Sequence, residues 1–445
     1  MWRVPHCRKI FWERPRHEKC KCHAHLSYES CSALGSGSGY CHELRIEISE
    51  LKTELKRARA FTDSLFGMVA RNTLYERPIP ARHRLIFYVG HLEAFDWNQL
   101  ARGVLGEPSF DPSFDSLFEA GIDPPPGQAP QDTPADWPAL EAVQAYVTRT
   151  RAAIDELWDT IPANMQQMVV EHRWMHAETI SYILHQLDPS LKRPALSSSA
   201  VVSAAVAPSA RFIEIEAGMT QLGQPNGEFG WDNEFPTHVE SVPAFEISQH
   251  KVTNGEYLRF VDQGGPTPLL WQMRNGQWHL RRMLDEVPLP LDAPVYATHQ
   301  QADLYARWAG ASLPTEAEWH RAAYRNDDHA YPWGNAAPNG IHGNFDFAFW
   351  DPVSVGAHPG GDSGYGVSQM IGNGWEWTST PFKGFDGFKA SSYYPTYSAN
   401  FFDDEHYVLK GGSPVTSRNL LRRSFRNWFR ADYPYVYSTI RLVRR

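Results

Sequence analysis

Residues 171–187, "EHRWMHAETISYILHQL", contain two histidines four positions apart in a stretch whose other apolar residues recur at helical spacing. Ile180 and Ile183 lie on the same helical face as His172 and His176 when residues are placed at 3.6 per turn. The stretch therefore predicts a helix whose apolar, core-facing side carries two imidazoles. We expect this helix to decide how the N-terminal part of the chain folds.

Three further segments share the same three- and four-residue spacing of apolar side chains. With residues 163–187 they make four predicted amphipathic helices, the others being at about 42–71, 82–103 and 138–160. A loop rich in Pro, Gly and Asp is predicted at 106–137. An antiparallel bundle is the simplest way to bury four apolar stripes of similar length. The imidazoles of the last helix would then point into the bundle.

The composition changes along the chain and suggests four regions. Residues 1–41 hold all five cysteines and a linker-like "GSGSG", which indicates a flexible extension before the bundle at 42–187. Residues 188–210 are rich in Ser, Ala and Pro, as a linker would be. Residues 211–445 show short apolar runs between Gly, Pro and Asn and one clear helical pattern at 297–309. They predict an irregular α+β domain.

The bulk composition excludes several function classes. A net charge of -9 over 445 residues provides no basic surface for nucleic acid. No apolar run of about 18 residues predicts a membrane span, and the basic N-terminus lacks the apolar segment of a secretory signal. We therefore expect a cytoplasmic protein with no nucleic-acid or membrane partner.

The histidines are candidate metal ligands. His172 and His176 project from one face a turn apart, which suits two ligands of one metal, and His91 lies on the core face of a different predicted helix. Such a pair arises by chance about once in a chain with this histidine content. Core histidines bonded to the backbone or to Glu171 and Glu178 are an equally plausible interpretation. If a metal is bound, three imidazoles leave open positions and suit zinc or ferrous iron.

Several motifs resemble a known family over residues 42–445. "LIFYVGHLEAFDWNQL" (85–100) and "EHRWMHAET" (171–179) resemble the DinB-like bundle of the ergothioneine-biosynthesis sulfoxide synthases, the EgtB family. "SLPTEAEW" (312–319) and "GNGWEWTST" (372–380) resemble the formylglycine-generating-enzyme fold that these synthases carry at their C-terminus. The resemblance implies a DinB-like four-helix bundle followed by a C-type-lectin-like α+β domain.

The resemblance also implies the chemistry. It implies one non-heme Fe(2+) held by His91, His172 and His176, and an oxygen-dependent coupling of a thiol to the imidazole of hercynine. Three neutral ligands agree with this because they leave room for both substrates and oxygen. We expect Glu178 to accept the second N–H of a ligand histidine and so to orient it.

Two groups of C-terminal residues are expected to contact the substrates. Trp428 matches the family tryptophan near the trimethylammonium group of hercynine, with Asn427 beside it, and a cation of this kind is best held over an aromatic face. The family also uses a tyrosine near the iron. Among Tyr393, Tyr394 and Tyr397 we choose Tyr394.

Two departures from the family pattern concern the sulfur donor. Synthases that use γ-glutamylcysteine place Gln before the third histidine and Asp after the tryptophan, whereas this sequence has Met175 and Phe429. We therefore favour cysteine over γ-glutamylcysteine as the donor. No residue of the sequence is predicted to bind a substrate carboxylate.

Other functions remain open at this stage. A selenoneine-type or ovothiol-type synthase has related chemistry, and a zinc-dependent thiol transferase of the DinB type or a non-catalytic ligand-binding module would need no iron. A true formylglycine-generating enzyme is excluded, because its cysteine pair has no counterpart after Cys41.

Overall fold

The computed structural model describes residues 37–119, 130–193, 211–325 and 327–445, with the backbone alone at 37–49. Most of the predicted extension and most of the predicted linker lie outside these residues. The chain divides into two compact units, residues 1–47 and 48–445, and the second contains the helices and strands that build the site.

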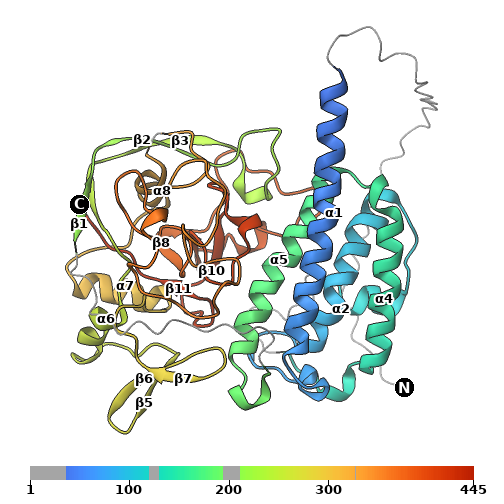
Figure 1. The fold of residues 1–445 in the computed structure, drawn as a ribbon, viewed down its shortest axis with the longest axis horizontal. Helices are drawn as coiled ribbons and strands as arrows, with labels where there is room; N and C mark the ends of the chain where they lie inside the picture. The colour runs from blue at the N-terminus through green and yellow to red at the C-terminus, as the bar shows by residue number, and fades with distance from the viewer. Residues whose placement is uncertain (1–36, 120–129, 194–210, 326) are drawn as a thin grey trace. The chain divides into compact units, whose positions relative to one another are not determined.

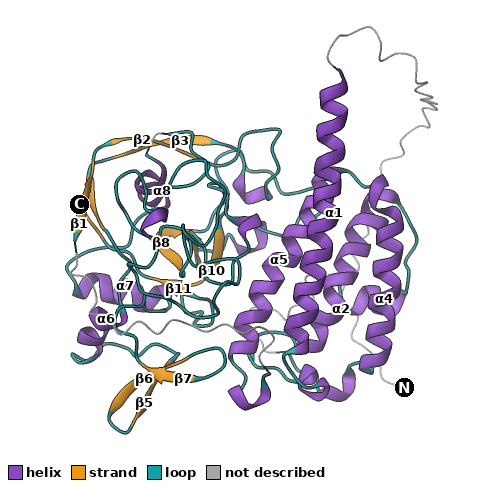
Figure 2. Cartoon of the chain, viewed as in Figure 1, coloured by secondary structure: helices purple, strands orange, loops and turns teal. Residues whose placement is uncertain are grey.

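The N-terminal half is helical (Figures 1 and 2). Its helices are α1 (Gly37–Gly67), α2 (Leu85–Asp96), which continues as a π-helix (Trp97–Leu105), α3 (Pro112–Leu117), α4 (Leu140–Leu157) and α5 (Ala163–His185). Four of the five correspond to the helices predicted from the spacing of apolar residues. The second helix, predicted to begin at about residue 82, begins at Leu85, because Arg84 before it has an extended backbone (ψ 155°).

The segment predicted as a loop at 106–137 contains the short helix α3. Asp111 caps this helix, because its side chain accepts a hydrogen bond from the backbone N–H of Phe114. Only six residues long, α3 leaves no periodic signal that sequence spacing could reveal.

The long helices pack on each other through apolar faces and through buried charges. Helix α2 lies against both α4 and α5. Polar contacts join α1 to its neighbours: Trp174 of α5 donates to Glu54 of α1 at 2.8 Å, and Arg59 of α1 pairs with Asp155 of α4 at 2.6 Å. The prediction of a helical half is confirmed, and a specific kinship with DinB bundles stays a prediction.

The C-terminal half is an α+β domain, as predicted. Its strands are β1 (Phe212–Ile215), β2 (Gly218–Leu222), β3 (His238–Val242), β4 (Phe245–Ser248), β5 (Trp271–Arg274), β6 (Gln277–Arg281), β7 (Glu286–Pro288), β8 (Trp375–Pro381), β9 (His406–Lys410), β10 (Asn427–Arg430), β11 (Ser438–Thr439) and β12 (Val443–Arg444). They form four small sheets with the orders β1-β4-β12, β10-β9-β8-β11, β2-β3 and β5-β6-β7.

Three helices accompany these sheets, where the sequence predicted one. They are α6 (Asn254–Val261), α7 (His299–Trp308) and α8 (Glu316–Tyr324). Each begins with a capping box, in which a threonine side chain and a Glu or Gln three residues later satisfy each other's backbone N–H groups. Helices α6 and α8 are eight and nine residues long, too short for their periodicity to stand out.

Helix α5 is one of the elements through which the two halves touch, and α1 is another, because Arg57 pairs with Asp346 at 3.1 Å. Glu178 accepts hydrogen bonds from Trp375 of β8, Ser413 and Thr416, at 2.7 to 2.8 Å. Glu171, two turns earlier, bonds to Trp231 and Arg422. One face of α5 therefore contributes to the bundle core and another is covered by the α+β domain.

Candidate metal centre and substrate cavity

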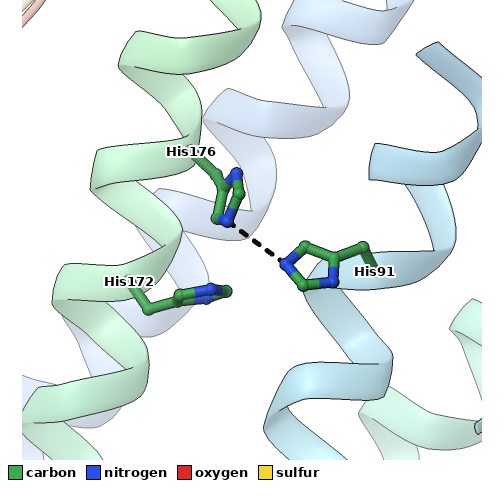
Figure 3. Close-up of side chains that lie close together, drawn as sticks. All are labelled: His91, His172 and His176. Atoms are coloured by element: carbon green, nitrogen blue, oxygen red, sulfur yellow. Dashed lines mark hydrogen bonds between the residues drawn. The ribbon is translucent and has the colours of Figure 1, made fainter. Parts of the chain in front are cut away.

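Three imidazoles from two helices meet inside the bundle (Figure 3). His91 lies on α2, and His172 and His176 lie a turn apart on α5. One ring nitrogen of each can be chosen so that all three lie within 4.8 Å of one another. The Nε2 atoms of His91 and His176 are 3.2 Å apart. The structure therefore brings together the three residues predicted from the sequence.

Burial keeps His172 and His176 in their neutral form. His91 and His172 are buried, and His172 stacks face to face on Phe95 with ring centres 3.4 Å apart. Burial first, and then the neighbouring imidazoles, hold the pKa of His172 well below its usual value, and burial followed by His91 does the same for His176. A neutral imidazole is the form that binds a metal.

A backbone carbonyl sets the orientation of His91. Its Nδ1 lies 2.9 Å from the carbonyl oxygen of Phe118, so Nδ1–H donates to that oxygen and Nε2 is left as the metal-binding atom. Sequence reasoning had assigned an orienting role to Glu178. The partners of Glu178 are instead Trp375, Ser413 and Thr416, and the hydrogen bonds of the described residues include none from a histidine to it. The contact of His91 with the main-chain carbonyl of Phe118 leaves no signal in the sequence.

The remaining imidazole nitrogens fit a metal. Both ring nitrogens of His172 and Nδ1 of His176 are buried without a hydrogen-bond partner among the described residues. A buried polar atom left in this way costs about 1–3 kcal/mol. A divalent ion bound by the lone pairs removes much of that cost, so the donor set suits a site for zinc or iron(II).

A buried ionic network fixes α2 against α5 beside the histidines. Arg173 of α5 is fully buried and donates to Glu93 and to Asp96 of α2, at 2.8 and 3.0 Å. Its charge and that of Arg151 hold the pKa of Glu93 down at about 2, against the opposing effect of burial. Arg173 therefore ties together the two helices that carry the ligands.

A cavity of about 260 Å³ opens beside the histidines, between α5 and the α+β domain. His172 and His176 line it, as do three residues that the sequence assigned to substrates: Tyr394, Asn427 and Trp428. The last two begin strand β10, which pairs antiparallel with β9. The structure thus brings the predicted substrate residues and two of the predicted metal ligands to one cavity.

Aromatic rings surround Trp428. Its indole stacks on Phe382 with ring centres 4.3 Å apart, and Tyr397 and Phe401 lie at 5.2 and 5.7 Å. Asn427 uses its side-chain oxygen to accept the backbone N–H of Trp428. Phe382 therefore holds the indole in place, and Trp428 also lines the cavity.

The three candidate tyrosines differ in position. Tyr393 is 46% exposed and is absent from the cavity wall, whereas Tyr394 and Tyr397 both line it. The Tyr394 ring lies 5.5 Å from Phe95, which stacks on His172. The Tyr397 hydroxyl donates to the sulfur of Met175 at 3.4 Å. Arg82 also lines the cavity, and sequence reasoning had not singled it out.

Comparison with known proteins agrees with this architecture. Residues 198–445 match the family described as "Sulfatase-modifying factor enzyme 1-like domain". The chain is 32% identical to "Hercynine oxygenase" of Mycolicibacterium smegmatis over 336 residues, which cover 67% of this chain and 77% of that protein. It is 28% identical to "Ergothioneine biosynthesis protein 1" of Schizosaccharomyces pombe, over 85% of this chain and 54% of that protein. With "Formylglycine-generating enzyme" of Bos taurus it shares 27% identity, over 42% of this chain and 62% of that protein.

The α+β half is thus a sulfatase-modifying-factor domain, joined to a helical half that carries three convergent histidines. The chain belongs to the EgtB family of sulfoxide synthases, the family of the hercynine oxygenases. No helix among the described residues has the length and apolar character needed to span a membrane.

Proposed function

We propose that this protein is an iron(II)- and oxygen-dependent sulfoxide synthase that joins cysteine to the imidazole ring of hercynine. The observation that carries the proposal is the convergence of His91, His172 and His176 beside a cavity bordered by Trp428. In the reaction a C–S bond forms while the thiol S–H and a ring C–H are lost. One oxygen atom of O2 ends in the sulfoxide and the other in water.

The three histidines would hold the iron through neutral imidazole nitrogens. When bound, iron(II) supplies electrons to dioxygen and open positions for the thiolate and the substrate imidazole. The Phe118 carbonyl keeps His91 in the tautomer whose Nε2 can bind. The Arg173 network holds α2 and α5 at the separation that the three ligands need.

Trp428 would bind the trimethylammonium group of hercynine. This group cannot donate a hydrogen bond, and it is attracted to the electron-rich faces of aromatic rings. Trp428, Tyr397 and Phe401 supply such rings along one wall of the cavity. A bound hercynine would then present its imidazole toward the histidines.

Tyr394 would donate a proton or hydrogen bond to the oxygen-derived group. A phenol is neutral at pH 7 and can give a proton at a defined position. Its location on the cavity wall next to Phe95 and His172 supports this role.

Two residues of the cavity wall favour cysteine as the sulfur donor. Met175 and Phe429 both line the cavity. The thioether of Met175 is only a weak acceptor and already accepts from the Tyr397 hydroxyl, and Phe429 has no acceptor for the ammonium group of a γ-glutamyl extension. Burial of that extension without a partner would cost free energy, whereas free cysteine avoids the cost.

The test is anaerobic reconstitution of the full chain with iron(II), followed by air, hercynine and one thiol at a time. We expect mass spectrometry to show the cysteine–hercynine sulfoxide with matching oxygen uptake, and a much smaller yield with γ-glutamylcysteine. His172→Gln should abolish the product, whereas His185→Gln, on the same helix but outside the cavity wall, should keep it. Retention of zinc with no oxygen uptake would instead favour a thiol transferase, and reaction with histidine or a selenium donor would favour the ovothiol or selenoneine types.

A further inference from the structure

Arg82, in the turn before α2, offers unused hydrogen-bond donors to the cavity. Its Nε donates to the Tyr433 hydroxyl at 3.2 Å, and one terminal nitrogen, Nη2, donates to the Tyr182 hydroxyl at 3.3 Å. The other, Nη1, makes no hydrogen bond within the described residues. The side chain is half-buried and lines the cavity with His176. A guanidinium in this position can bind one more partner.

Among the described residues, the cavity wall contains no other cation of this kind. Arg426 is paired with Glu316 at 3.0 Å, and His406 lies 2.9 Å from Asp403. Arg82 has only phenols as partners and has no ion pair among the described residues. The wall therefore carries one positive charge that no carboxylate of the described chain neutralises.

The surroundings of Arg82 differ from those of Trp428. Tyr433 stacks on Phe429 with ring centres 4.9 Å apart, and the Arg82 guanidinium lies over the Tyr433 ring at 5.4 Å. Trp428 instead contacts Phe382, Tyr397 and Phe401. Since Trp428 and Phe429 are consecutive in β10, their side chains leave the strand on opposite sides. Arg82 thus belongs to the Phe429 side of the cavity.

We propose that Arg82 binds the carboxylate of the thiol donor and selects for donors that have one. Its planar fork of N–H groups matches the two oxygens of a carboxylate. The inference rests on the proposed function, and it supplies the carboxylate contact that the sequence left unassigned.

Hercynine is the less suitable partner for Arg82. It carries its carboxylate on the same carbon as its trimethylammonium group. A hercynine whose ammonium lies against Trp428 therefore has its carboxylate near that wall as well. The Phe429 side, where Arg82 has no carboxylate partner among the residues that the structure describes, is left to the second substrate.

The test compares cysteine with cysteamine, which has the same thiol and ammonium but no carboxylate. In Arg82→Gln we expect KM for cysteine to rise about 10- to 100-fold, because a charged hydrogen-bonded contact is lost. KM for cysteamine and KM for hercynine should stay within about threefold of wild type. Arg82→Lys should be intermediate, since it keeps the charge but not the fork. Arg84→Gln is the matched control, because Arg84 donates to Asp132 and is absent from the cavity wall.

An equilibrium measurement separates this inference from the proposed function. The iron(II)-loaded full chain is titrated anaerobically with cysteine and with cysteamine, and binding is detected by tryptophan fluorescence. Wild type should bind cysteine more tightly than cysteamine, and Arg82→Gln should lose this preference. A wild type that binds cysteine but forms no sulfoxide would refute the proposed function and leave the Arg82 contact standing. Equal binding of the two thiols by wild type would overturn the inference, as would a selective rise in the KM for hercynine or an unchanged KM for cysteine in Arg82→Gln.

Discussion

His172 illustrates how a single residue can identify a site. A core position normally holds an apolar side chain, and an imidazole with two unsatisfied nitrogens lowers stability. Stacking on Phe95 fixes the ring but satisfies neither nitrogen. A metal ion that binds one of these nitrogens would remove part of this cost. This residue therefore connects stability with function.

We expect iron(II) or zinc to stabilise the folded chain through this residue. A ligand at 100 times its dissociation constant adds about 2.7 kcal/mol to the free energy of unfolding. Thermal unfolding with and without metal should therefore show a higher Tm in its presence, and a chelator should reverse the change. In His172→Gln the metal should produce a much smaller shift. An equal shift in the variant would mean that the ion binds elsewhere.

Trp428 offers a second prediction for a single side chain. Replacing it with leucine keeps an apolar contact with Phe382 but removes the aromatic ring that would hold a quaternary ammonium. Loss of about 1–2 kcal/mol corresponds to a 5- to 30-fold rise in the KM for hercynine. Steady-state oxygen uptake measures this, and the KM for cysteine serves as the internal control. A change confined to cysteine would assign Trp428 to the other substrate.

At the level of elements, the separation of α2 and α5 decides whether three ligands can meet. Apolar packing brings the helices together, and the Arg173–Glu93–Asp96 network fixes their register because its charges are fully buried and must remain paired.

Breaking this network should be costly. In Arg173→Met the buried Asp96 loses its close partner and Glu93 keeps only Arg151, and we expect the free energy of unfolding to fall by about 3–5 kcal/mol. Metal affinity should also weaken, because the ligand helices lose their fixed register. Urea unfolding and metal titration measure the two effects, with Arg102→Gln, a change at an exposed residue of the π-helix, as the control. A fully stable variant would show that apolar packing alone sets the register.

For the whole molecule, the contact between α5 and the α+β domain matters most, because the cavity lies there. His185 at the end of α5 is part of it: its Nδ1 lies 2.7 Å from the Tyr437 hydroxyl and its Nε2 3.1 Å from the Arg281 carbonyl. Nε2–H therefore donates to the carbonyl, and Nδ1 accepts from the phenol. The neutral ring thus has both nitrogens satisfied.

This contact should weaken in acid. Burial, followed by the charges of Lys192 and Arg281, lowers the pKa of His185 to about 3, from about 6.5 in the unfolded chain. The unfolded state therefore takes up a proton first, and stability present above pH 6.5 is lost as the pH falls toward 3. At pH 5 this amounts to about 2 kcal/mol. In His185→Gln the difference in unfolding free energy between pH 7 and pH 5 should shrink by this amount. An unchanged difference would assign the acid sensitivity to other histidines.

Much of this protein follows from its sequence. Apolar spacing predicts the long helices because each needs one continuous buried face, and the motifs around His91, His172 and Trp428 predict the family and both halves of the site. Short helices such as α6 and α8 escape this reasoning, because their limits come from caps and from packing rather than from periodicity.

Only the tertiary structure decides which groups meet. It gives His91 a main-chain acceptor at Phe118, directs Glu178 to Trp375 instead of a histidine, and brings Arg82 into the cavity wall. Spacing along a chain determines which residues share a face of one helix. Contacts between residues far apart in sequence depend on how separate elements pack, and one sequence alone does not encode that in any local pattern.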